Sequence, residues 1–393
     1  MPYHNRFRHQ PYHVDSHDCS VDWLSPPPPP APYAEAGLEC LAGAGELFLK
    51  AGVRAIYLLH GTFVGTDALG LIRGIARAWP EIADVLYRAQ KHTLDRFAGD
   101  AGNFSPQYAA DLEQALNRGI DSQSRIPVRL FHWSGENHHV GRADGAVRLI
   151  DELASRTDLP GGRVLLCGHS HGGNVLALVS NLLANDPAAS REFFDAAIAY
   201  YRWPLWGRTD IKVWERVRQL VDSEHRPLAD VSLDMVTLGT PVRYGWDLGG
   251  CAKLLHFINH RPEKGRRTHL AAFPAAVEDV LAAIGGDYVQ QLGIAGTDAL
   301  HPFWAWRAWR AERNLARLLQ PGLRLRHTLQ RLKLGVRLHQ DGLNLLVDYG
   351  LPGGHIGQHH AGHAVYTRRA WMPFHFEEIA RRFYRAGEPS IEK

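Results

Sequence analysis

Apolar residues along the chain follow two alternating patterns, and together these predict an α/β protein. Short, mostly apolar runs predict strands at residues 53–59, 126–133, 164–167, 231–238, 253–258 and 343–347. Between several of them, apolar residues return every three or four positions, which predicts helices at 69–79, 82–97, 107–118 and 143–155. Because strands and helices alternate repeatedly, we expect a mostly parallel central sheet with helices on both faces.

The passage from strand to helix at residues 163–184 is the most informative part of the chain. The apolar run 164–167 is typical of a strand buried on both faces, and helical spacing begins at Asn174. Only the sequence GHSHGG at 168–173 joins the two elements, so the turn is very tight and Ser170 stands at its apex. Such a turn holds a serine hydroxyl above the sheet edge, beside the N–H groups at the start of the helix. The flanking elements therefore favour a nucleophile over a bystander serine in a glycine-rich turn.

Three further motifs have a suggestive order along the chain. Residues 45–61 are predicted as a hairpin whose second strand ends in HGTF at 60–63, and the strand at 231–238 runs into LGTP. After the strand at 343–347 come a histidine-rich loop and an amphipathic helix at 371–385. With GHSHGG, this order resembles the α/β-hydrolase superfamily, and most closely its bacterial lipase and esterase branch, over most of residues 45–385. The resemblance implies an α/β-hydrolase fold with helical cap insertions.

The resemblance also implies where the oxyanion donors and the pocket lie. The N–H groups of His171 and Thr62 are the best candidates for the oxyanion hole, and the Phe63 N–H is the next candidate. Phe63 is also predicted to contact the substrate. Loops that leave the carboxyl ends of parallel strands line the active-site face, so Asn137 and His138 are predicted at the pocket rim. A solvated polar loop is an equally good interpretation of the segment that contains them.

The resemblance implies a histidine base after the last strand and before the last helix, since a serine hydroxyl needs a base to react. Four histidines qualify by position, and His363 is preferred because Ala361-Gly362-His363-Ala364 comes directly before the helical stretch. The others are His355, His359 and His360. The pairs His355/His359 and His359/His363 are each four residues apart, which also fits a zinc site, but glycines argue against a helix there and no acidic or cysteine cluster joins them. We therefore expect no metal.

The acid of the triad is left open between two aspartates. Asp348 stands at the carboxyl end of the strand 343–347, whereas the family's acid belongs one strand earlier. Asp287, in Gly286-Asp287-Tyr288-Val289, resembles the sequence often found around that acid. Asp247 is an outside option. We weight Asp287 and Asp348 equally and expect the other to be structural.

Two insertions are predicted to form a cap or lid, at about 187–230 and 261–335. The first contains the aromatic sequence YYRWPLWGR, and the second an amphipathic helix at 301–320 with Trp306, Trp309 and several arginines. This helix fits either a lid that meets a lipid surface or a cap helix with a solvated basic face. We slightly favour the cap helix.

Composition narrows the remaining choices. The 393 residues are 45% hydrophobic, enough for one large domain at 37–393 after a proline-rich leader, 1–36, that we expect to be disordered. The net charge of +3 is too mild to indicate nucleic-acid binding. Cys167 falls in a predicted buried strand, so the four cysteines indicate no disulfide framework. No apolar run spans a bilayer and the polar N-terminus lacks a signal core, so we expect a cytoplasmic protein, with signal-less export left open.

These features predict a serine hydrolase that cleaves carboxylic esters without a cofactor. Aromatic insertions favour a lipid-like ester, and the basic stretch 307–337 is compatible with an anionic membrane surface, which makes a phospholipase a plausible refinement. Two alternatives stay open. One is a non-catalytic hydrolase-like binding or scaffold protein, and the other is an amidase or peptidase with the same triad.

Overall fold

A computed structural model gives the fold of the chain. It describes residues 7, 19–29, 31, 34–62, 103–184, 186–203, 205–223, 228–265, 267–271, 277–295, 305–320, 335, 337–354 and 356–385. The helices predicted at 69–79 and 82–97 lie outside these residues, as do Phe63 and His355.

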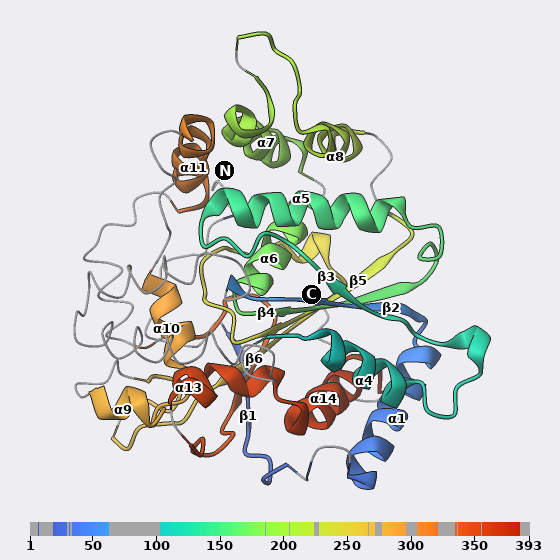
Figure 1. The fold of residues 1–393 in the computed structure, drawn as a ribbon, viewed down its shortest axis with the longest axis vertical. Helices are drawn as coiled ribbons and strands as arrows, with labels where there is room; N and C mark the ends of the chain where they lie inside the picture. The colour runs from blue at the N-terminus through green and yellow to red at the C-terminus, as the bar shows by residue number, and fades with distance from the viewer. Residues whose placement is uncertain are drawn as a thin grey trace.

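A seven-stranded sheet forms the centre of the structure (Figure 1), and all of its pairings are parallel. The strand order is β1-β7-β6-β5-β4-β2-β3. The strands are β1 (Ser20–Leu24), β2 (Val53–Leu59), β3 (Val128–Phe131), β4 (Arg163–His169), β5 (Ser232–Leu238), β6 (Lys253–Asn259) and β7 (Leu343–Val347). The predicted α/β class and parallel sheet are confirmed.

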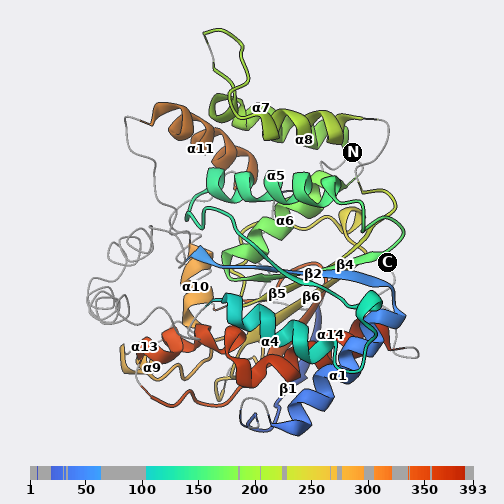
Figure 2. The same cartoon turned by 45° about the vertical axis from the view of Figure 1, so that its right-hand side comes forward.

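Helices cover both faces of this sheet (Figures 1 and 2). On one face lie α5 (His139–Ser155) and α6 (His171–Leu183), and on the other α1 (Glu35–Lys50), α4 (Pro106–Leu116) and α14 (Met372–Tyr384). Neighbouring strand residues point to opposite faces, so Leu165 packs in the core with α1, α4 and α14, and Leu166 in the core with α5 and α6.

A further helical layer lies beyond α5. It contains α7 (Pro187–Tyr201), α8 (Lys212–Asp222) and α11 (Trp306–Leu319) (Figure 2). α7 packs on α8 and α11, and α8 and α11 pack on α5. The shorter helices are α9 (Val277–Leu281), α10 (Tyr288–Ala295) and α13 (Ile356–His359). They lie near one another (Figure 1), and α10 and α13 both contact residues 360–367. None of the helices in the described ranges is long and apolar enough to cross a membrane.

The structure differs from the predictions in two N-terminal segments. Residues 45–50 belong to helix α1, so the predicted hairpin is wrong. Leu41, Ala44 and Phe48 are buried at helical spacing, and this pattern runs through the segment assigned to a strand. Strand β1 falls within the predicted leader and pairs with β7. It is an edge strand with no fully buried residue, so its apolar signal is weak.

The order of strands reverses between β2 and β4. The chain passes from β2 to its neighbour β3, then crosses to β4 on the other side of β2 and continues outward through β5, β6 and β7. Ligands of open parallel sheets bind beyond the carboxyl ends of the strands at such a reversal. Residues 60–62 and Ser170 follow β2 and β4 at this point.

Candidate active site

Ser170 occupies a strained turn between β4 and α6. Its backbone has φ 52° and ψ −128°, a region that costs free energy for any residue other than glycine. Two hydrogen bonds hold it there: its N–H donates to the Leu238 carbonyl (2.9 Å), and the Thr240 hydroxyl donates to its own carbonyl (2.8 Å). Strain that the surrounding structure maintains in this way is typical of a functional position.

The turn after β2 lies directly against this serine. A methyl group added to Gly61 would lie 2.7 Å from the Ser170 Cβ and 3.4 Å from its Oγ, so only glycine fits. Gly172 is equally constrained, because a methyl group there would lie 2.7 Å from the His60 carbonyl oxygen. The two motifs that the sequence placed far apart therefore form one compact site.

His363 and Asp287 form a buried acid–base pair beside this turn. The His363 Nδ1 lies 2.7 Å from the Asp287 Oδ2, and both side chains are buried. The other carboxylate oxygen accepts the Gln290 N–H (2.8 Å). Because the carboxylate accepts, we assign the imidazole proton to Nδ1, which leaves the lone pair of a neutral ring on Nε2. That Nε2 is buried and has no hydrogen-bond partner among the residues that the structure describes.

Asn259, at the carboxyl end of β6, positions both members of the pair. Its carbonyl accepts the Asp287 N–H (3.0 Å), and its side-chain amide donates to the Gly362 carbonyl (2.8 Å), next to His363. The buried Arg337 donates to the same Asn259 carbonyl (2.9 Å). Burial lowers the pKa of the Arg337 guanidinium, and the nearby Asp287 carboxylate acts in the opposite direction. Sequence patterns do not reveal Asn259 or Arg337, since each acts through contacts distant in the chain.

His169 lies next to Ser170 in the chain and packs against His363. It precedes Ser170 in the chain, and its ring centroid is 4.7 Å from that of His363. Burial, and then the proximity of His363, hold the pKa of His169 well below its usual range, so this imidazole is neutral. No hydrogen bond joins Ser170 Oγ to His363 Nε2 here, as is common in sites without substrate. Ser170 is buried and exposes only 2% of its surface.

Asp348, the other candidate acid, contacts different residues. Its carboxylate accepts the Arg261 Nε (3.0 Å) and the Gly350 N–H (3.0 Å), and one third of its side chain is exposed. Arg261 also donates to the carbonyls of Ala283 and Ile284, just before Asp287. Asp348 thus supports the turn that leads to Asp287.

The two candidate oxyanion donors are adjacent in sequence to residues of the turns after β2 and β4. Thr62 follows the Gly61 turn, and His171 is the first residue of α6, where backbone N–H groups have no acceptor within the helix. The His60 carbonyl accepts the Trp133 Nε1–H (2.9 Å), which fixes the preceding turn. Phe63 lies outside the described residues.

Asn137 and His138 are buried rather than solvated. The Asn137 Oδ1 accepts from Arg142 (3.1 Å), and the His138 Nδ1 accepts the Gly141 N–H (2.8 Å) at the start of α5. Both therefore hold this helix terminus, and contact with a substrate stays a prediction.

A buried arginine that the sequence analysis missed lies behind the predicted oxyanion hole. Arg142 is fully buried, and its guanidinium lies 3.4 Å from the His171 Nδ1 and donates to the Tyr244 hydroxyl (2.7 Å). It therefore brings a fixed positive charge close to the residue after Ser170. Its burial was not predictable, because Arg142 ends a polar sequence that was interpreted as a loop.

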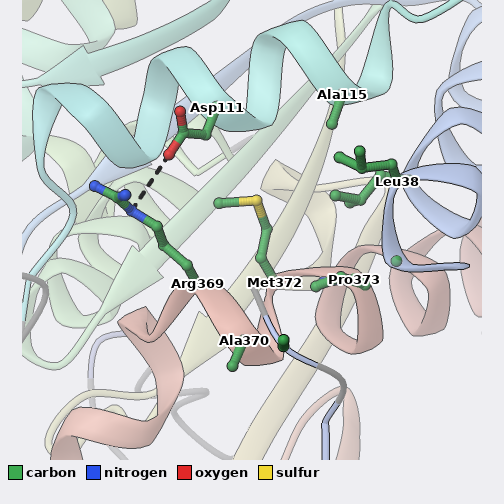
Figure 3. A pocket seen from close by; sticks show the side chains of 10 residues that line it. Leu38, Asp111, Ala115, Arg369, Ala370, Met372 and Pro373 are labelled. Carbon is green, nitrogen blue, oxygen red and sulfur yellow. Dashed lines mark ion pairs between the residues drawn. The ribbon is translucent and has the colours of Figure 1, made fainter. Parts of the chain in front are cut away.

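Two further features bear on this site: the possible metal ligands and the pocket of Figure 3. Within the described residues, no group of three or more His, Cys, Asp or Glu side chains could hold a metal ion. The pocket in Figure 3 lies between α1, α4 and the start of α14, and includes the Asp111–Arg369 ion pair (3.3 Å). None of Ser170, Asp287 and His363 lines it.

Comparisons of the chain with protein-family models, with curated proteins and with solved structures found no significant match. The fold and the geometry of the site are therefore the basis for a function.

Proposed function

We propose that the protein is a serine hydrolase of the α/β-hydrolase type that cleaves carboxylic esters. The observation that carries the proposal is the buried His363–Asp287 pair (2.7 Å) beside the strained turn at Ser170. Serine, aspartate and histidine follow one another in that order along the chain, as in α/β-hydrolases. The position of the turn at the reversal of strand order supports the same function.

The proposed reaction uses each of these groups in turn. Ser170 Oγ attacks the acyl carbonyl while His363 Nε2 takes its proton, and Asp287 stabilises the imidazolium that forms. The N–H groups of Thr62 and His171 bind the developing oxyanion. His363 then protonates the departing alcohol, and an acyl-enzyme remains. Water, deprotonated by His363, releases the acid and restores Ser170.

A lipid-like ester is the substrate class we propose. The layer of α7, α8 and α11 carries many aromatic side chains, including Tyr200, Trp214 and Trp309. Such side chains favour an apolar acyl group, as in a lipase, an esterase or a phospholipase. A small-molecule ester is the minimal substrate.

A direct test is labelling with a fluorophosphonate probe and hydrolysis of p-nitrophenyl esters of increasing acyl length. We expect both in the wild type and neither in Ser170→Ala, because the variant lacks the hydroxyl that would attack the probe or the ester. Ser180→Ala is a matched control, since Ser180 is a buried serine in the helix that follows Ser170. Labelling that persists in Ser170→Ala would refute the assignment.

The same assay separates the two alternatives. Faster turnover of anilides than of esters would indicate an amidase or peptidase. A folded wild type that neither reacts with the probe nor cleaves any ester would favour a non-catalytic binding protein. The buried contact of Asp287 with His363 argues for the enzyme over the binding protein.

A further inference from the structure

The loop between α7 and α8 carries the most exposed apolar side chains of the described structure. Leu205 and Trp206 are 82% and 81% exposed, and Trp203 beside them is also exposed. This loop projects away from the rest of the molecule (Figures 1 and 2). Burial of such side chains in the fold would gain free energy, so their exposure indicates an external contact.

The backbone holds these side chains outward in a small hairpin. Arg202 and Thr209 form an isolated antiparallel bridge, and the Trp203 N–H donates to the Arg208 carbonyl (2.8 Å). Gly207 has a φ of 60°, which suits the tight turn. The apolar tip is therefore presented by a structured element.

Helix α11 extends the same surface. The Arg307 guanidinium lies 4.9 Å from the centre of the Trp203 ring and donates to the carbonyls of Ala199 (3.0 Å) and Tyr200 (2.9 Å). This fastens α11 to the base of the hairpin, and α11 exposes two further tryptophans, Trp306 and Trp309. We call these five residues the aromatic tip surface: Trp203, Leu205, Trp206, Trp306 and Trp309.

The charge around the aromatic tip surface is positive. Exposed arginines on the hairpin and on α11 are Arg208, Arg310, Arg313 and Arg317. The acidic residues nearby are neutralised or buried: Asp210 pairs with Arg307, Glu215 pairs with Arg202, and Glu312 faces inward. Self-association through this surface would bring like charges together, which disfavours a second copy as the occupant.

We propose that the aromatic tip surface binds the surface of an anionic lipid membrane. Tryptophan is enriched at the membrane–water interface because its ring is both apolar and able to hydrogen bond. Arginines beside an apolar tip add attraction to anionic head groups. A projecting, convex tip suits insertion into head groups better than it suits a protein groove. This inference goes beyond the proposed reaction and does not depend on it.

The surface is also connected to the candidate active site. On the inner side of α11, the Glu312 carboxylate accepts the N–H groups of His139 (2.9 Å) and Val140 (2.8 Å) at the start of α5. One turn further along α5, Arg142 contacts His171, the residue after Ser170. A membrane bound at α11 would therefore lie close to the end of the molecule where the reaction occurs.

Sedimentation with vesicles of phosphatidylcholine alone, or mixed with phosphatidylglycerol, tests the inference. The protein carries Ser170→Ala so that no lipid is cleaved. We expect stronger binding to the anionic vesicles, and at least about tenfold weaker binding after Leu205→Ala with Trp206→Ala, since two apolar side chains no longer enter the lipid. Leu351→Ala is the matched control, because Leu351 is 67% exposed outside this surface.

A second variant tests the charges. Arg310→Gln with Arg313→Gln should remove most of the preference for anionic vesicles and its decrease with salt. Absence of vesicle binding, or binding that the tip variant leaves unchanged, would overturn the inference. So would light scattering that shows a dimer which the tip variant converts to a monomer, because the occupant would then be a second copy. Activity on soluble esters without vesicle binding would overturn this inference alone, and binding without any hydrolase activity would overturn the proposed reaction alone.

Discussion

Asp287 and Asp348 both lie at the carboxyl ends of strands, but their surroundings differ. Asp287 is hydrogen-bonded to the last residue of β6, and Asp348 directly follows β7. Asp287 is fully buried against His363, whereas Asp348 is partly exposed and pairs with Arg261. A buried carboxylate stabilises an imidazolium more strongly than a solvated one, because water does not screen the interaction. At the scale of single residues, this difference in burial is what distinguishes a candidate acid from a structural ion pair.

Replacing the two aspartates by asparagine separates these roles. Asp287→Asn keeps the shape of the side chain but lets its amide donate to His363, which favours the wrong tautomer. We expect kcat for p-nitrophenyl esters to fall by roughly 10⁴-fold, as for the equivalent change in other triads. Asp348→Asn should change kcat by only a few fold. Equal losses in both variants, with circular dichroism unchanged, would argue against the assignment of Asp287.

The turn between β4 and α6 is the element that combines the most constraints. Its serine has a positive φ, and its glycines lie within contact distance of neighbouring backbone. A methyl group at Gly168 would lie 2.6 Å from the Gly173 nitrogen, because the strand and the helix converge there. Such a turn is stable only because β2 and β5 hold it on both sides.

Gly172→Ala should therefore destabilise the protein and impair the site. The added methyl group would lie 2.7 Å from the carbonyl oxygens of both Leu59 and His60, which belong to backbone that cannot move freely. We expect a loss of about 1–3 kcal/mol in the free energy of unfolding, measured by urea denaturation, together with reduced kcat.

The control is Gly43→Ala in α1, where nothing lies within 4 Å of the added methyl group. Removing a glycine from a helix interior should raise the free energy of unfolding by about 0.5–1 kcal/mol. If both variants shifted stability in the same direction, the steric argument for the turn would be wrong.

Elements were predictable from the sequence where one local pattern determines them. Strand β7 was predicted to the residue, because all five positions are buried and the run is unbroken. Residues 45–50 were mistaken for a strand because six residues are too few to distinguish a buried helical turn from a strand. β1 was missed because half-exposed edge strands lack a continuous apolar run.

At the scale of the whole molecule, the site shows what a single sequence does not determine. Ser170 and His363 stand out through local motifs, whereas Asp287 reaches the site only because the chain returns to β6 after a long segment. The bridge between His260 and Gly286 and the bond from Asp287 to Asn259 make that return. These contacts join residues 26 and 28 positions apart, so no spacing rule distinguishes Asp287 from Asp348.

Buried histidines give the whole protein a predictable response to acid. Burial lowers the pKa of His375 to about 3 and of His260 to about 3, so both imidazoles are neutral in the folded protein above that pH. In the unfolded chain they take up protons below about pH 6.5. The unfolded state then binds more protons than the folded state. Stability is therefore unaffected above about pH 6.5 and falls as the pH drops from there towards 3.

Each of these histidines should contribute about 1.4 kcal/mol per pH unit to the fall in the free energy of unfolding near pH 5. His375→Gln tests this contribution, because glutamine can still hydrogen bond to the Tyr349 hydroxyl, which lies 2.8 Å from the His375 Nε2. We expect urea denaturation at pH 7, 6 and 5 to give a smaller slope in this variant, with a difference that is small at pH 7 and approaches about 1.4 kcal/mol per pH unit at pH 5. Above pH 7 the free energy of unfolding should have the same pH slope in the variant and the wild type, because neither state takes up a proton at this position. An unchanged slope at pH 5 would mean that His375 is protonated in the folded protein, and its buried position would then have to open in acid.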